Sequence, residues 1–199
     1  MFRRISLILL TASLLLALAS PAGAFDNKRK GFMLGFGLGP ALSSYTQTIG
    51  FEGVPGETSD RQNDLALRTD FRIGFGASEL VQIYWMSKVN WFGMKNVFGD
   101  NVTISNGVGG VGLTYFLQPT DPSPYLLGGL GFSTWSTPFE SGSEAWYGVG
   151  LALGAGYQFR NHLAIEGGFT WGKPSKTEGG LEVSSNALSF GVTLNYIAF

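Results

Sequence analysis

The sequence contains no cysteine among its 199 residues. A chain without cysteine can form neither disulfide bonds nor thiolate metal sites, and it cannot carry a lipid on an N-terminal cysteine. Its stability must come from the hydrogen bonding and packing of its own secondary structure. We expect it to use no metal or other cofactor.

Charged residues are also scarce. They make up 14% of the chain, and the formal net charge is −1. Loss of an N-terminal segment containing Arg3 and Arg4 would leave 11 of the 13 basic residues against 14 acidic ones. This balance excludes the basic surface of a nucleic-acid-binding protein, so no nucleic acid is expected as a partner.

Long apolar runs are missing from all but the N-terminus. There, a run from Ile5 to Ala19 follows Arg3 and Arg4 and precedes Ala22-Gly23-Ala24. A basic start, a short apolar stretch and small residues at the end are typical of a secretory signal peptide, and the run is shorter than the ~18 residues of a membrane helix. We predict that residues 1–24 are a cleaved signal peptide and that residues 25–199 form one domain.

The remaining chain is rich in glycine (30 residues) and in aromatic residues (14%), and it alternates apolar with polar or small residues. Alternation at period two indicates half-buried β-strands. Eight such segments can be recognised: 32–39, 67–76, 80–91, 102–117, 124–135, 147–158, 163–171 and 188–196. In the fourth, the alternation changes phase, which suggests a β-bulge near residues 107–110.

The connections between these segments alternate in length. Long connections are expected at 40–66, 92–101, 136–144 and 173–185, and short ones at 77–79, 118–123 and 160–162. An even number of strands with long loops at one end and short turns at the other is typical of membrane barrels. The sequence therefore predicts an all-β fold, an eight-stranded antiparallel transmembrane up-and-down β-barrel. The 40–66 loop is the candidate site for an extracellular ligand.

Four tryptophans lie where the predicted strands meet the long loops. These residues are Trp91, Trp135, Trp146 and Trp171. Tryptophan is enriched where a membrane protein crosses the lipid interface, so we expect these four to form an interfacial girdle.

Charged residues on the predicted strands share the face opposite the large apolar ones. They are Arg68, Asp70, Arg72, Lys88 and Glu166. A basic side chain in the middle of a bilayer costs about 2–4 kcal/mol, so these residues must face the lumen. Eight strands leave an interior only wide enough for side chains, and we expect the charges to pair and plug it, with the lumen-facing glycines making room.

The signal peptide, the amphipathic strands, the long loops and the terminal Phe199 together resemble the small outer-membrane barrels of the opacity, OmpA-transmembrane and OmpX-like group. The resemblance implies residence in the cell outer membrane, as a monomer in contact with lipid and lipopolysaccharide. It also implies that the segment 188–199, with Tyr196 and Phe199, is an assembly signal read by the barrel-assembly machinery.

Alternatives remain open at this point. A few eight-stranded barrels acylate or deacylate lipid A, and the single histidine, His162, lies four residues before Glu166; no serine is obviously placed to complete a catalytic set. The barrel could be a narrow porin-like conduit. A soluble lipocalin-like barrel would instead place the apolar residues inside.

Overall fold

The computed structural model describes residues 28–51, 54, 56–95, 99–142 and 144–199. The predicted signal peptide lies outside the described residues. No helix long and apolar enough to cross a membrane occurs in the described part of the chain. The strands are β1 (Gly31–Phe51), β2 (Glu57–Thr58), β3 (Gln62–Gly76), β4 (Val81–Lys95), β5 (Asn101–Phe116), β6 (Ser123–Ser136), β7 (Trp146–Arg160), β8 (Leu163–Glu178) and β9 (Leu181–Ala198).

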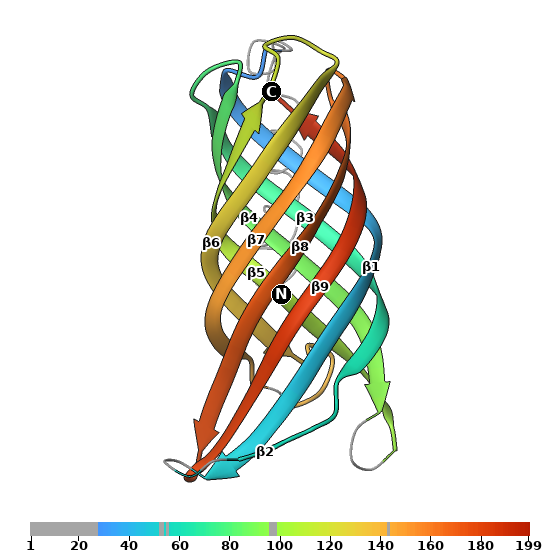
Figure 1. The fold of residues 1–199 in the computed structure, drawn as a ribbon, viewed down its shortest axis with the longest axis vertical. Coiled ribbons are helices and arrows are strands. Elements are labelled where there is room, and N and C mark those ends of the chain that lie inside the picture. Colours follow the sequence, from blue (N-terminus) through green and yellow to red (C-terminus); the bar gives the residue numbers. More distant parts are fainter. Residues whose placement is uncertain (1–27, 52–53, 55, 96–98, 143) are drawn as a thin grey trace, which may run out of the picture.

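Eight long strands form a closed ring. Each long strand pairs antiparallel with its neighbours in chain order, and β1 pairs with β9 from Leu34↔Ala198 to Phe51↔Leu181. The two-residue strand β2 folds back on β1 at one end of the barrel. Figure 1 shows the strands running steeply tilted around the ring. The predicted eight-stranded antiparallel up-and-down barrel is thus confirmed.

The two ends of the barrel differ. The start of β1 and the end of β9 lie at one end, called the terminal end here, at the top of Figure 1. The β3–β4, β5–β6 and β7–β8 turns lie at this end as well. The opposite, distal end carries β2 and the β4–β5, β6–β7 and β8–β9 connections. A two-glycine turn closes the last of these, with Gly179 at φ 60° and Gly180 at φ 80°. Positive φ favours glycine because it has no Cβ.

Two of the predicted long loops are wrong. β1 continues through residues 40–51 and β3 begins at Gln62, so most of the expected 40–66 loop is hydrogen-bonded sheet. Likewise β8 extends to Glu178 and β9 begins at Leu181. The strands run on while their outward side chains change from apolar to polar. On β1, Leu42 is followed on the same face by Ser44, Thr46 and Thr48.

The predicted bulge in the fourth segment is also wrong. β5 keeps one unbroken register against β4, from Lys95↔Asn101 to Val81↔Tyr115. Val102, Ile104 and Val108 are buried inside the barrel. The apparent change of phase arises because the interior itself becomes apolar towards the distal end.

The exterior is apolar over most of the barrel. On β1, Phe36, Leu38 and Leu42 are each about half exposed, and every long strand contributes similar residues. Other members of this surface are Leu67, Phe75, Val111, Leu113, Leu130, Val149, Ile165, Phe190, Val192 and Leu194. A lipocalin-like barrel would place these large apolar residues inside. The structure places them outside, so that alternative is wrong.

Glycine makes room for large side chains inside the barrel. A Cβ built on Gly35 would lie 2.5 Å from Arg72 Cγ, and one on Gly112 would lie 2.5 Å from a ring carbon of Tyr84. A Cβ on Gly156 would lie 2.2 Å from Tyr125 Cζ. Each glycine is the direct cross-strand partner of the large residue, so it leaves space beside that side chain on the same part of the wall.

We expect Gly156→Ala to destabilise the barrel by about 1–3 kcal/mol, because the added methyl group overpacks the buried Tyr125 ring. The matched control is Gly167→Ala, where the nearest atom to the new Cβ, Val192 Cγ2, is 4.0 Å away. The stability of both variants can be measured by urea unfolding in detergent micelles. The folded fraction is read from the heat-modifiable migration of the barrel on a denaturing gel. Equal stability of the two variants would contradict the packing role of Gly156.

Candidate functional site in the barrel interior

A layer of charged side chains crosses the middle of the barrel. Alternate positions on β3 direct Arg68, Asp70 and Arg72 inward, β4 contributes Lys88, and β8 contributes Glu166. All five predicted charges lie inside the barrel, each no more than 5% exposed. We call them the charge layer.

Glu166 is the centre of the ion pairs in this layer. Arg72 Nη2 donates to Glu166 Oε2 at 2.7 Å, and Lys88 Nζ donates to Glu166 Oε1 at 2.5 Å. Lys88 also donates to Asp70 Oδ2 at 2.8 Å, and the Tyr125 hydroxyl donates to Glu166 Oε2 at 3.1 Å. A single carboxylate thus connects β3, β4, β6 and β8 across the lumen, which sequence spacing alone could not show.

Arg68 is held differently. It forms no ion pair with any described residue, and its guanidinium donates to Asn90 Oδ1 at 2.8 Å and to the backbone oxygens of Gly168 and Ser189, both at 3.0 Å. These acceptors come from β4, β8 and β9. Hydrogen bonds to these neutral acceptors stabilise the charged guanidinium of Arg68 without a counterion. The charge layer consequently holds three cations and two carboxylates.

An aromatic cluster lies inside the barrel on the distal side of the charge layer. The Tyr45 ring stacks on Phe92 at a centroid distance of 5.4 Å and meets Trp135 edge-on at 4.9 Å. Trp146 stacks on Trp135 at 6.3 Å. The buried members are Tyr45, Phe92, Val102, Ile104, Trp135 and Ala187.

The predicted tryptophan girdle is wrong for two of its four residues. Trp135 is 3% exposed inside the barrel, and Trp146 packs against the same aromatic cluster. Trp91 and Trp171 lie on the outer face, where their indole nitrogens donate to Thr69 Oγ1 and Asn186 Oδ1. Position at a strand end does not determine which face a residue occupies. Parity along the strand does.

A second apolar cluster lies inside the barrel on the terminal side of the charge layer. Its buried members are Met33, Tyr84, Met86, Val108, Phe116, Tyr125, Leu127, Ala152, Ala164, Ile197 and Phe199. The alternation of β9 continues to the end of the described strand, so Ile197 and Phe199 face inward while Tyr196 faces outward and is 52% exposed. Of the two residues implied as an assembly signal, Tyr196 is therefore the one on the apolar exterior.

Arg29 lies at the terminal mouth of the barrel, and no sequence pattern predicts its place there. It is 3% exposed, its guanidinium carbon lies 3.9 Å from the Phe116 ring centre, and it pairs with Asp121. It also donates to Gln158 Oε1 at 3.0 Å and to the Gln118 carbonyl at 2.7 Å. Burial lowers the pKa of Arg29, and the Asp121 carboxylate opposes that shift. Arg29 precedes the alternating segment, so no periodicity marks it.

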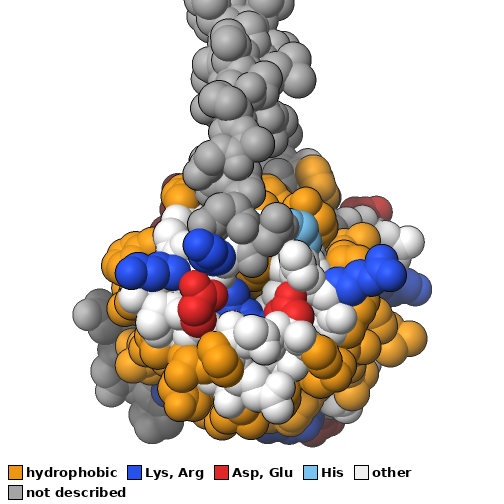
Figure 2. All heavy atoms as spheres, turned by 90° about the horizontal axis from the view of Figure 1, so that it is seen from above, with side chains coloured by type: hydrophobic (Ala, Val, Ile, Leu, Met, Phe, Trp, Pro, Cys, Tyr) orange, Lys and Arg blue, Asp and Glu red, His pale blue; other side chains and the backbone are white. Residues whose placement is uncertain are grey.

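Seen from the terminal end, basic and acidic side chains gather over the middle of the barrel and hydrophobic side chains form most of the rim (Figure 2). A pocket of about 430 Å³ lies there, lined by Lys28, Arg29, Glu79, Pro119, Thr120, Asp121, Gln158 and Asn161. His162 lies at the same end, with Nδ1 2.8 Å from the Ile197 carbonyl oxygen and its ring against Tyr196 and Phe199. No group of three or more His, Cys, Asp or Glu that could hold a metal occurs among the described residues.

Comparison with known proteins shows likeness of fold. Neither a protein-family model nor a curated protein matches the chain. Among solved structures, the chain is similar to the attachment invasion locus protein Ail of Yersinia pestis, solved in complex with the heparin analogue sucrose octasulfate. The two are 14% identical, with a TM-score of 0.42, and the match covers 83% of this chain and 99% of Ail. OprG of Pseudomonas aeruginosa is 12% identical (TM-score 0.48, 86% and 98% covered). Neisserial surface protein A is 11% identical (TM-score 0.47, 82% and 96% covered).

These structural neighbours are small bacterial outer-membrane β-barrel proteins. The likeness at this identity concerns the fold, and the charge layer must be understood from its own geometry.

Glu166→Gln should destabilise the barrel by about 3–5 kcal/mol, because it leaves the buried Arg72 without its ion pair and Lys88 with Asp70 alone. The matched control, Glu178→Gln, removes an exposed carboxylate that pairs with Lys176, and we expect no measurable change there. Urea unfolding in micelles compares the two variants. A stable Glu166→Gln barrel would show that Glu166 does not hold the layer together.

Proposed function

We propose that the chain is an integral outer-membrane β-barrel with a closed interior, which strengthens the envelope and presents its distal end to the outside. The observation that carries this proposal is the filling of the lumen by three successive layers. The distal aromatic cluster, the charge layer and the terminal apolar cluster follow one another along the axis, and Arg29 closes the terminal mouth.

Membrane insertion is supported by the contrast between the two faces of the sheet. A closed antiparallel ring satisfies the backbone hydrogen bonds of its strands without water, which is the condition for crossing a bilayer. The exposed Phe, Leu, Ile and Val side chains would be costly in water and favourable in lipid. We propose that lipid and lipopolysaccharide cover this exterior, and that Trp91 and Trp171 lie at the interface with the headgroups.

The distal end is proposed to face the outside. Beyond Leu42, the outward side chains of β1 are Ser44, Thr46 and Thr48, and those of β9 before Leu188 include Asn186 and Ser184. A polar exterior is not stable in hydrocarbon, so the distal part of the barrel would project from the membrane as continuous sheet. The barrel-assembly machinery would read the last strand, with Tyr196 as its lipid-facing aromatic residue.

A closed lumen predicts that the purified protein conducts no ions. The aromatic cluster contains no charged side chain to replace the hydration shell of an ion, and its Tyr45 hydroxyl already donates to Asp64. In the charge layer, both carboxylates are already paired with Arg72 or Lys88. We expect planar bilayers containing the refolded protein to show no stable conductance steps. Large, stable steps would overturn the closed interior and favour the porin-like alternative.

A catalytic role in lipid A modification is not part of the proposal. His162 is engaged with the Ile197 carbonyl and with two aromatic rings, which supports a packing role at the end of β9. We expect the mass of lipid A to be the same with and without expression of the protein. A mass change that is lost in His162→Ala, with the heat-modifiable barrel preserved, would establish the enzyme instead.

A further inference from the structure

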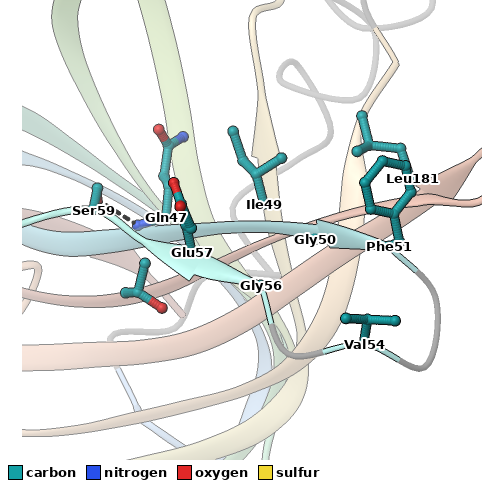
Figure 3. A pocket seen from close by; sticks show the side chains of 10 residues that line it. Gln47, Ile49, Gly50, Phe51, Val54, Gly56, Glu57, Ser59 and Leu181 are labelled. Atoms are coloured by element: carbon teal, nitrogen blue, oxygen red, sulfur yellow. Dashed lines mark hydrogen bonds between the residues drawn. The ribbon is translucent and has the colours of Figure 1, made fainter.

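An apolar surface lies at the distal tip of the barrel, on the face of β1 that carries the buried Ser43 and Tyr45 deeper inside. Ile49 is 55% exposed, Phe51 67%, Val54 61% and Leu181 40%. A pocket of about 610 Å³ lies beside them (Figure 3). The outward residue at this level is Thr48, which pairs with Thr58, so lipid would not cover the tip. Large exposed apolar surfaces outside a membrane usually mark interaction sites.

The strand register explains how these residues form one surface. Ile49 and Phe51 lie two positions apart on β1 and share a face. Ile49 pairs with Val183 and Phe51 pairs with Leu181, so two strands bring four apolar side chains together. Figure 3 shows Phe51 beside Leu181. We call Ile49, Phe51, Leu181 and Val183 the apolar stripe.

Acidic groups border the apolar stripe on both sides. On the β2 side, Glu57 pairs directly with Ile49 and forms no ion pair with any described residue. On the β8 side, Glu178 pairs with Leu181, and it shares the single cation Lys176 with Glu144, at 2.6 Å and 2.8 Å. Both flanks therefore carry an excess of negative charge.

We propose that the apolar stripe is a docking surface for a protein segment in which apolar side chains are flanked by lysine or arginine. The apolar side chains would bury against Ile49, Phe51 and Leu181, and the basic groups would approach Glu57 and the carboxylates around Lys176. Complementary charge at the rim of an apolar contact selects the partner and speeds association. This proposal rests on the proposed function, because such a partner must reach the outer end of the barrel.

The test uses the full refolded protein in detergent micelles and three fluorescent peptides. One carries the core Lys-Leu-Phe-Lys, one the charge-reversed core Glu-Leu-Phe-Glu, and one the polar core Lys-Ser-Ser-Lys. We expect saturable binding of the first in fluorescence anisotropy, and binding weaker by about tenfold or more for the other two.

Variants separate the apolar and the electrostatic contributions. Phe51→Ser should weaken binding of the Lys-Leu-Phe-Lys peptide by about tenfold or more. The matched control is Phe139→Ser, which removes a 75% exposed distal phenylalanine outside the stripe and should leave binding unchanged. Glu57→Lys should shift preference towards the charge-reversed peptide. The heat-modifiable gel shift verifies that each variant is folded.

Several outcomes would overturn the docking surface. Equal binding of the three peptides would do so, as would binding that Phe51→Ser leaves intact. Self-association of the protein in sedimentation experiments that Phe51→Ser abolishes would identify a second copy as the occupant. Binding to phosphatidylcholine vesicles that depends on Phe51 would identify a lipid surface. Conductance steps, by contrast, would overturn the closed barrel without affecting this peptide test.

Discussion

Closure of the sheet between β1 and β9 is the constraint on which the other features depend. Once the ring is closed, every strand has one face towards the axis and one away from it, and no sheet edge remains along the wall. The charge layer can exist only because closure removes its side chains from lipid. The same closure aligns Ile49 and Phe51 with Val183 and Leu181 at the distal tip.

The packing of the barrel interior depends on the volumes of its side chains as much as on their charges. Arg72, Tyr84 and Tyr125 find space inside the barrel because the residue paired with each on the neighbouring strand is a glycine: Gly35, Gly112 and Gly156. Glu166 then collects Arg72, Lys88 and the Tyr125 hydroxyl around one carboxylate. These ion pairs, with an apolar cluster on either side of them, are the basis for proposing a closed structural barrel in place of a conduit.

Some errors of the sequence interpretation have a common physical origin. The sequence predicts a loop over residues 40–66, because the alternation of large apolar residues stops there, yet the strand continues as far as Phe51. In a membrane barrel, the change from apolar to polar on the outer face marks the limit of the lipid, and the hydrogen-bond ladder does not depend on it. The 173–185 loop prediction is wrong for the same reason, since β8 runs to Glu178 and β9 begins at Leu181. In β5, the apolar residues on the inner face look like a change of phase in the sequence, because the interior of a barrel can be polar at one depth and apolar at another.

The sequence by itself determined the β-strand class, the eight-fold repetition and the inward direction of Arg68, Asp70, Arg72, Lys88 and Glu166. Period-two alternation and the cost of a charge in lipid are local properties, and both can be evaluated from neighbours along the chain. Only the tertiary structure decided that Trp135 and Trp146 lie inside, that Arg29 is buried at the terminal mouth, and that Glu166 is the shared partner. Those outcomes depend on which residues of distant strands lie opposite one another, and register across a closed ring is set by all the strands together.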